Sequence, residues 1–226
     1  MSSLPVPPDI AKIAPDGNLT PRQKRRILIE MSLRKQKPGT GSGHEFMRRR
    51  TAMHPWPDLR SILDGVDWVL IGGVATRAYM PERVTKDMDI LVRQADGEDV
   101  VGRLKRAGYT VVSKLAVPGY LLQSPEGVEL DILFGKSRWL DEALAHPERD
   151  VAGYPVIGLP YLVMLKMAVN RGRDLGDLTT MLGWASDEAL AKIREVVTRY
   201  SPEDSGDLES LIFIGKKEQE TPSQAE

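Results

Sequence analysis

Apolar and polar residues follow two patterns along the chain, which divide it into a strand-rich part and a later helix-rich part. Short apolar runs bounded by glycine, proline or charged residues are typical of strands, and five of them occupy residues 66–71, 87–92, 109–114, 120–123 and 128–134. Apolar residues at helical spacing predict helices at residues 74–80, 97–107, 160–170, 174–184, 187–200 and 208–214. Strands that precede a group of helices indicate an α/β (α+β) class, with a mixed sheet, flanking helices and a C-terminal helical lobe.

The first 55 residues follow neither pattern for long and cannot form a core of their own. Half of the 16 prolines fall within the first 57 residues, and the run Gly-Thr-Gly-Ser-Gly at residues 39–43 is typical of a linker. One helix is predicted here, at residues 20–37. Thr20 suits its N-cap, Pro21 its first position, and Gln23 the return hydrogen bond of a capping box.

These patterns predict three regions of the chain. We expect residues 1–55 to form a basic, partly disordered arm, residues 56–215 to form the folded domain, and residues 216–226 to form a disordered tail. Within the domain, the sheet core is expected at about 66–135 and the helical lobe at about 158–214.

Charge separates the arm from the body. The formal net charge of -1 conceals 12 lysines and arginines against 5 acidic residues in residues 1–60, so the remainder is acidic. Such an arm either holds nucleic acid through phosphate contacts that are independent of sequence, or carries a helix that is solvated or docked on the body. The second interpretation is slightly favoured, because no aromatic side chains interleave with these charges to stack on bases.

Composition excludes several kinds of site. The chain has no cysteine, which excludes a disulfide scaffold, a cysteine-liganded zinc site and a catalytic thiol. Its three histidines are scattered, so a metal would have to be held by oxygen, which favours Mg²⁺, Mn²⁺ or Ca²⁺. The sequence contains neither an export signal nor an apolar run of about 20 residues, so we expect a cytoplasmic protein without membrane contact.

Two acids in one predicted strand are the leading candidates for chemistry. Asp87 and Asp89 are two residues apart, so their carboxylates share a strand face at about 6.5 Å spacing and repel each other unless a cation lies nearby. The alternative is a solvated strand face, because Asp-x-Asp is frequent by chance. Asp131, on a later strand, either completes a three-carboxylate cluster or occupies an ordinary exposed position like that of Glu129.

A glycine pair precedes these acids. Gly72 and Gly73 follow a predicted strand and open a predicted helix, an arrangement that presents backbone N–H groups and a helix dipole to a phosphate. The simpler interpretation of the pair is a tight turn.

Three ordered sequence blocks resemble a known superfamily. They are Ile-Gly-Gly-Val-Ala at residues 71–75, Arg-Val-Thr-Lys-Asp-Met-Asp-Ile-Leu-Val at residues 83–92, and the lysine- and aspartate-containing stretch at residues 159–178. This combination is similar to the DNA polymerase β-type nucleotidyltransferases, and most similar to the bacterial AbiEii-type toxin nucleotidyltransferases. The resemblance covers about residues 66–182 and implies a nucleotidyltransferase-type sheet.

The resemblance also implies residue roles. The implied catalytic residues are Asp87, Asp89, Asp131, Lys166 and Asp174. The implied nucleotide-binding residues are Gly72, Gly73, Arg83, Thr85, Lys166 and Asp177. The three strand acids would bind two Mg²⁺ or Mn²⁺ ions when an NTP, such as ATP, is present. Competing interpretations stay open: Lys166 as a snorkelling lysine and Asp174 as a helix cap. Arg83 and Thr85 either orient the acids or bind phosphate, and a loop salt bridge is the alternative.

The resemblance implies transfer of a nucleoside monophosphate from an NTP to a hydroxyl acceptor. RNA contacted by the basic arm is one acceptor, and a toxin role with an antitoxin partner is one setting. Two other functions are weighed against it. One is a small-molecule adenylyltransferase of the antibiotic-modifying type. The other is a non-catalytic module that binds a nucleotide or a partner.

Overall fold

Seven strands form one mixed sheet in the part of the chain that the computed structural model describes, namely residues 6, 8–35, 56–81, 85, 87–169 and 171–220. The order across the sheet is β3-β4-β5-β2-β1-β7-β6. The strands are β1 Trp68–Ile71, β2 Asp87–Arg93, β3 Thr110–Lys114, β4 Gly119–Gln123, β5 Glu129–Gly135, β6 Glu148–Arg149 and β7 Pro155–Val156. The expected mixed sheet is therefore present, with β2 in its middle.

The two faces of β2 have different surroundings. Met88, Ile90 and Val92 are fully buried, and they point toward the face covered by α5 (Gly97–Arg106), because Gly97 lies against Phe134, the register partner of Val92. The opposite face carries the acidic residues of the strand. Burial of the apolar face fixes the register, because a slip by one residue would exchange the two faces.

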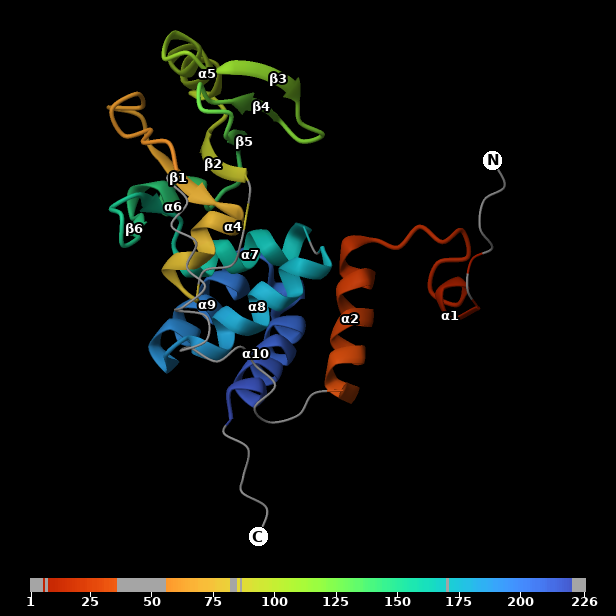
Figure 1. Cartoon of the computed structure of the whole chain (residues 1–226). Helices are drawn as coiled ribbons and strands as arrows, with labels where there is room; N and C mark the ends of the chain where they lie inside the picture. The colour runs from red at the N-terminus through yellow and green to blue at the C-terminus, as the bar shows by residue number, and fades with distance from the viewer. Residues whose placement is uncertain are drawn as a thin grey trace.

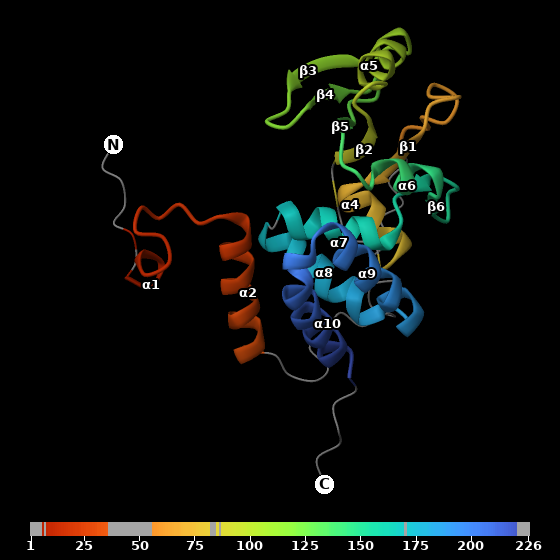
Figure 2. The same ribbon diagram turned by 180° about the vertical axis from the view of Figure 1, so that it is seen from behind.

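Helices of the C-terminal half pack together below the sheet (Figures 1 and 2). They are α7 Leu159–Val169, α8 Gly172–Trp184, α9 Asp187–Tyr200 and α10 Ser205–Gln219, with the short 3-10 helix η2 Pro202–Asp204 before the last. A Cβ atom on Gly183 would lie 2.5 Å from the Gly215 carbonyl oxygen, and one on Gly215 would lie 2.2 Å from that of Thr179. The backbones of α8 and α10 are thus in direct contact at these glycines.

The N-terminal arm contributes the helices α1 Pro8–Ala11 and α2 Pro21–Lys35. The predicted capping box is confirmed: the Thr20 backbone N–H donates to Gln23 Oε1 at 2.8 Å, and the Gln23 N–H donates to Thr20 Oγ1 at 3.3 Å. Both ribbon views show α2 beside the C-terminal helices, and it contacts α7, α8 and α10. Of the two interpretations of the basic arm, the structure agrees with the second for this helix, because α2 is docked on the body.

One buried arginine anchors the arm. Arg25 is 2% exposed, and its Nε donates to Asp207 Oδ2 at 2.9 Å. Its terminal nitrogens donate to Asp204 and to the Met167 carbonyl oxygen. Ile29, one turn further along α2, is also buried. A buried charge with partners on α7 and at the start of α10 holds α2 in one position.

Several elements differ from the expected boundaries. Residues 74–80 form not one helix but the single turn α4 (Gly72–Ala75) followed by the 3-10 helix η1 (Thr76–Ala78). The two-residue strands β6 and β7 and the helix α6 (Leu140–Ala145) lie outside the expected sheet core and helical lobe. Strands this short carry no detectable alternation, and α6 has fewer than two turns in which a period could show.

The chain end also differs from expectation. The helix predicted at 208–214 runs from Ser205 to Gln219, so residues 216–219, expected in the tail, are helical. Lys216 Nζ donates to the Ala185 carbonyl oxygen at 2.7 Å, which ties this last turn to the end of α8. The arm helix was expected to reach residue 37, and residues 36 and 37 lie outside the described ranges.

None of the helices in the described ranges has both the length and the apolar character that a membrane crossing requires.

We predict that Arg25→Ala releases α2 from the body, because it leaves the buried Asp207 without its closest cation. Truncating one partner of a buried pair costs about 3–5 kcal/mol. Limited proteolysis should therefore cut within residues 21–35 much faster in this variant. Arg26→Ala is the matched control, since Arg26 is 60% exposed and lies 3.4 Å from Asp207. Equal cleavage rates for the two variants would contradict the anchoring role.

Candidate active site

Three carboxylates of the central strands lie on one face of the sheet. Asp89 on β2 is the register partner of Asp131 on β5, and Asp87 is that of Glu129. Register partners on adjacent strands point to the same side. The strand pairing therefore brings Asp131 close to Asp87 and Asp89, although Asp131 lies 42 or more positions further along the chain.

Crowding of these acids changes their ionisation. Burial, followed by the charges of Asp87 and Asp131, raises the pKa of Asp89 to about 7, and nearby Arg171 and Lys166 oppose the rise only in part. Burial and the charges of Asp87 and Glu129 also raise the pKa of Asp131. Asp87, Asp89 and Asp131 therefore form a cluster of like charges, and the neighbouring cations do not fully offset their mutual repulsion.

Gly72 makes room for the Asp89 carboxylate. Its φ is +66°, and a Cβ atom at this position would lie 1.9 Å from Asp89 Oδ2. The turn leads into α4, which is a single helical turn. Its dipole is therefore weaker than that of the full helix expected from the sequence. Gly73 is buried, and its carbonyl oxygen accepts from the Thr76 hydroxyl at 2.7 Å. Gly72 is thus in contact with an acid of the cluster, and Gly73 belongs to the turn behind it.

Thr85 orients the first acid of the cluster. Its hydroxyl donates to Asp87 Oδ1 at 2.6 Å. Of the two roles considered for Thr85, contact with the acids is the one that this bond supports. Arg83, the other residue expected in this loop, lies outside the described residues.

A buried ion cluster lies on the helical side of the site. Lys166 on α7 is 4% exposed, and its Nζ donates to Asp177 Oδ2 at 2.6 Å and to Asp174 Oδ1 at 3.3 Å. Asp174 Oδ2 accepts from both the backbone N–H and the Nε of Arg171, at 3.0 Å each. Lys166 is therefore held by two carboxylates rather than snorkelling to solvent.

The start of α8 differs from the helix cap considered for Asp174. The helix begins at Gly172 with Arg171 as its N-cap, so Asp174 is the third helical residue. Burial alone would raise the pKa of Asp174, but hydrogen bonds from Arg171 and the charge of Lys166 outweigh it and lower that pKa. Asp174 therefore stays ionised and fixes two cations beside the strand acids.

A cavity of about 300 Å³ separates the strand acids from this ion cluster. Asp89, Asp131 and Gly72 line it from the sheet, and Lys166, Asp174 and Arg171 line it from the helices. The other expected site residues in the described ranges, Asp87, Gly73, Thr85 and Asp177, lie outside this lining. Its size and mixed polarity are those of a small-ligand site.

Two contributors to the cavity are not among the site residues predicted from the sequence. Arg171 carries an exposed side chain whose charge reaches both Asp87 and Asp89. Its signal in the sequence was its position three residues before an acid at a helix start. Residues 115–117, in the loop between β3 and β4, close another side of the cavity, and nothing in their composition marks them as site residues.

The donor chemistry of the strand face can be compared with that of a metal site. All candidate donors are carboxylate oxygens, which suit Mg²⁺ or Mn²⁺. Across the described ranges, however, no three acidic or histidine side chains stand in an arrangement that could hold an ion. The three acids thus offer the right donors and an excess of negative charge, but they do not yet form a set of ligands around one point.

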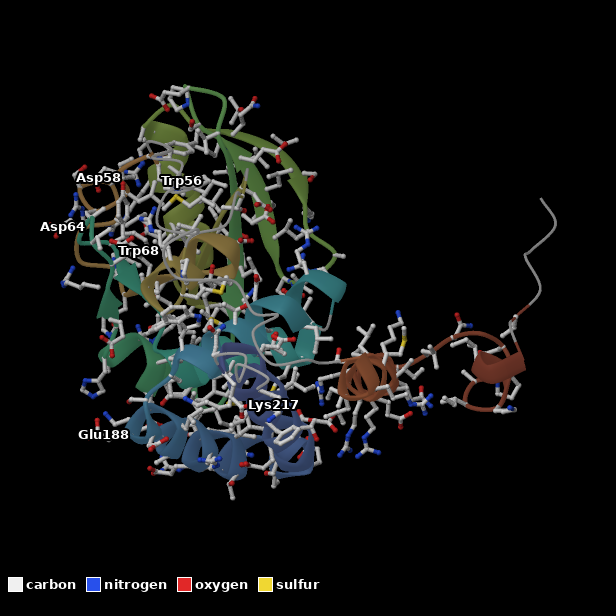
Figure 3. All side chains as sticks on the ribbon, turned by 60° about the horizontal axis from the view of Figure 1, so that its bottom comes forward. Trp56, Asp58, Asp64, Trp68, Glu188 and Lys217 are labelled. Carbon is white, nitrogen blue, oxygen red and sulfur yellow. The ribbon has the colours of Figure 1, made fainter. Side chains whose placement is uncertain are left out.

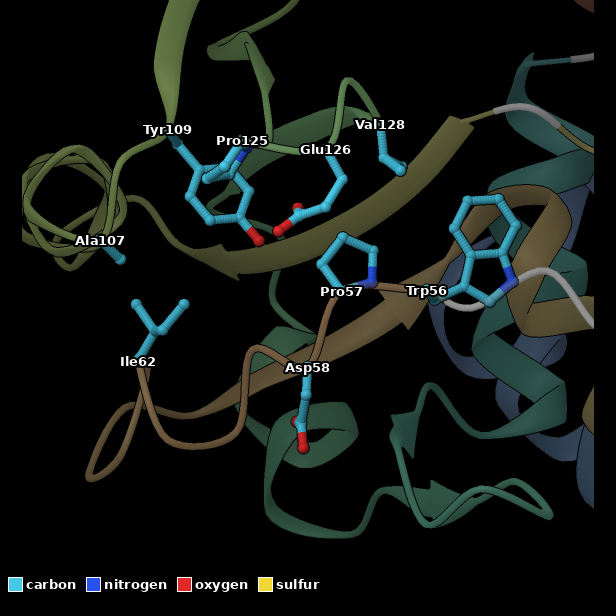
Figure 4. Close-up of a pocket in the computed structure, with 9 residues that line it drawn as sticks. All are labelled: Trp56, Pro57, Asp58, Ile62, Ala107, Tyr109, Pro125, Glu126 and Val128. Carbon is cyan, nitrogen blue, oxygen red and sulfur yellow. The ribbon is translucent and has the colours of Figure 1, made fainter.

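A second cavity, of about 540 Å³, lies beside the end of α5 and contains none of the expected site residues (Figure 4). Trp56, Pro57, Tyr109 and Glu126 are among its lining side chains. Burial, with a contribution from the charge of Glu126, raises the pKa of Tyr109 to about 12. The tyrosine therefore stays protonated at neutral pH.

Comparison with known proteins finds structural neighbours but no sequence family. No family model matches the chain, and no curated protein does. The antibiotic-resistance factor ANT(2'')-Ia, solved with adenylyl-2''-tobramycin, is 17% identical with a TM-score of 0.40, over 70% of this chain and 92% of that one. The lincosamide adenylyltransferase LnuA, solved with lincomycin, is 15% identical with a TM-score of 0.35, over 58% of this chain and 85% of that one.

Cid1, solved with the UTP analogue UMPNPP, is 17% identical with a TM-score of 0.29, over 81% of this chain and 49% of that one. At these values the likeness assigns neither a reaction nor a substrate to this chain.

We predict that Gly72→Ala destabilises the protein by more than its backbone strain alone. The added Cβ must displace the Asp89 carboxylate, so the free energy of unfolding should fall by about 2–4 kcal/mol. Gly65→Ala is the matched control: its φ is +75° and a Cβ there meets no atom within 4 Å. Urea denaturation compares the two, and equal losses would show that the collision does not matter.

The raised pKa of Asp89 predicts a pH-dependent stability. A carboxyl with a folded pKa of about 7 and an unfolded value of about 3.9 favours folding below pH 4, and this contribution is lost as the pH rises to 7. In metal-free buffer, Asp89→Asn should therefore raise the free energy of unfolding at pH 8 by about 4 kcal/mol. The gain should vanish near pH 3.5. The control is Asp64→Asn in the exposed loop before β1, and a gain for Asp89→Asn that does not change with pH would refute the assignment.

Proposed function

We propose that this chain is a metal-dependent nucleotidyltransferase that moves a nucleoside monophosphate from an NTP to a hydroxyl acceptor. The observation that carries the proposal is the register pair of Asp89 and Asp131, which faces a cavity with Arg171 and Lys166 on its opposite wall. Carboxylates on one wall and cations on the other suit a polyphosphate that is bridged to the protein by metal ions. The sequence resemblance to nucleotidyltransferases supports the same reaction.

The strand acids would hold the metal. Asp87, Asp89 and Asp131 would supply carboxylate oxygens to Mg²⁺ or Mn²⁺ after their side chains turn toward a common point, and the Thr85 hydroxyl already holds one oxygen of Asp87. When bound, such ions neutralise phosphate charge and lower the pKa of an attacking hydroxyl. Asp131 is suited to receive the proton of that hydroxyl at a carboxylate oxygen, because it lines the cavity beside its register partner Asp89.

The helical wall would bind the phosphates. Asp174 holds Arg171 through Nε and leaves its two terminal nitrogens available for phosphate oxygens in a fixed geometry. Lys166 donates two of its three N–H bonds to Asp174 and Asp177, so one donor is left for the nucleotide. Asp174 and Asp177 therefore act as positioning residues for these two cations.

The biological setting stays a prediction. An antitoxin partner and a toxin role rest on the AbiEii resemblance, and a cytoplasmic location rests on the sequence pattern. Expression of the chain in bacteria tests the toxin role: growth should stop when it is induced and should be unaffected by the catalytically inactive form.

Transfer activity tests the proposed reaction. Wild-type protein is incubated with each α-labelled NTP, Mg²⁺ and a mixture of RNA, protein and small-molecule acceptors, and label transfer is measured. The double variant Asp87→Asn/Asp89→Asn should reduce transfer by about a hundredfold or more, because the strand acids lose both their charge and their metal. Chelation with EDTA should have the same effect.

Glu129→Gln is the matched control for this experiment. Glu129 is exposed, carries the same charge and is the register partner of Asp87, so its neutralisation should change the rate only severalfold. Full transfer by the double variant would rule out the proposed mechanism.

A further inference from the structure

The cavity beside the end of α5 has no part in the proposed reaction. It measures about 540 Å³, a size typical of small-ligand sites, and it shares no lining residue with the catalytic cavity. Its walls come from the loop before β1, from the residues between α5 and β3, and from the turn between β4 and β5. Most of the lining side chains are apolar, namely Trp56, Pro57, Ile62, Ala107, Pro125 and Val128.

The Tyr109 hydroxyl is a buried polar group of this cavity that the fold leaves without a hydrogen bond. The side chain is 6% exposed, and within the described ranges its hydroxyl has no hydrogen-bond partner. Figure 4 shows the hydroxyl aimed into the cavity, toward Glu126 and Pro57. A buried hydroxyl without a partner is unfavourable. Tyr109 therefore indicates a ligand that supplies the missing hydrogen bond.

Glu126 gives the cavity one negative charge that no ion pair offsets in the part of the chain that the structure describes. Its carboxylate points into the same part of the cavity as the Tyr109 hydroxyl (Figure 4). The other lining acid, Asp58, points away in that view, and Arg60 donates to its two oxygens at 2.7 and 2.8 Å. The described lining residues include neither lysine nor arginine. The cavity thus presents two oxygen acceptors and a single uncompensated negative charge.

We propose that this cavity binds a small organic monocation, with a primary ammonium group on an apolar body. The ammonium group lies between Glu126 and Tyr109 and donates one N–H bond to the carboxylate and another to the phenol oxygen. The apolar body packs against the side chains of Trp56, Pro57 and Ile62. Glu126 repels an anionic ligand, and a polyamine would bring further charges that have no partner here. The ligand is therefore neither the nucleotide nor the acceptor of the proposed reaction.

Calorimetric titration tests this ligand class without requiring activity. Phenethylamine hydrochloride is titrated into the full-length protein, and phenylacetate and 2-phenylethanol serve as probes with the same ring but a negative or a neutral end group. The amine should bind at least about tenfold more tightly than either probe, because only the amine pairs with a carboxylate. Spermidine should bind no more tightly than phenethylamine. Equal affinities for the amine, the acid and the alcohol would overturn the proposal.

Two conservative variants test the residues. Glu126→Gln should weaken phenethylamine binding by about tenfold. Tyr109→Phe should weaken it severalfold, yet leave the melting temperature of the unliganded protein unchanged or higher, because it breaks no hydrogen bond of the fold. Glu188→Gln is the matched control: this exposed residue of α9 lies far from Trp56 and Asp58 in Figure 3, and its neutralisation should not change amine binding.

The amine site and the proposed reaction can fail separately, since none of these measurements depends on label transfer. Unchanged amine binding in both cavity variants would overturn the amine site. Competition between phenethylamine and ATP would also overturn it, because the amine would then lie beside the strand acids of the catalytic cavity. A marked fall in the melting temperature of unliganded Tyr109→Phe would show that the hydroxyl serves the fold rather than a ligand.

Discussion

Repulsion between the carboxylates of Asp89 and Asp131 is the constraint that the rest of the site is built around. Parallel pairing of β2 with β5 places the two acids side by side, and their partial burial weakens the screening of their charges by water. The burial of Met88 and Ile90 on the opposite face holds this arrangement, because the strand cannot slip without exposing them. The apolar core thus supplies the free energy that keeps like charges together.

A second group of ionic contacts, made by Lys166 and Arg171, lies opposite these negatively charged strand acids. Lys166 and Arg171 are both near the strand acids, yet each is tied to Asp174, so neither can collapse onto Asp89 and neutralise it. The cluster of Lys166, Arg171, Asp174 and Asp177 carries two positive and two negative charges. It is balanced within itself and leaves the negative potential of the strand face largely intact, which is what an incoming cation requires.

Local chemistry could be predicted from the sequence where it depends on near neighbours. The alternation that puts Asp87 and Asp89 on one strand face, and the capping box of Thr20 and Gln23, involve residues within a few positions of each other. The partnership of Asp89 with Asp131 needed the order of strands in the sheet, which no local pattern specifies. Five of the seven strands could be predicted because each is an apolar run bounded by glycine, proline or charged residues.

Contacts between distant segments account for what could not be predicted. Whether the basic helix is solvated or docked depends on the pairing of Arg25 with Asp204 and Asp207, which are near the other end of the chain. The state of Lys166 depends likewise on how α7 packs against α8. The steric role of Gly72 follows from the position of a side chain on the next strand, and a glycine in a turn gives no sign of it.

The glycine contact between α8 and α10 has a mechanical meaning for the whole lower half of the molecule. With no side chains between them at Gly183 and Gly215, the two helices cannot slide or roll without a clash of backbones. The N-terminal end of α8 carries Asp174, and the N-terminal end of α10 carries Asp207, the anchor of the arm. The two helices therefore move as one rigid unit. The spacing between the arm and the body is fixed when the chain folds.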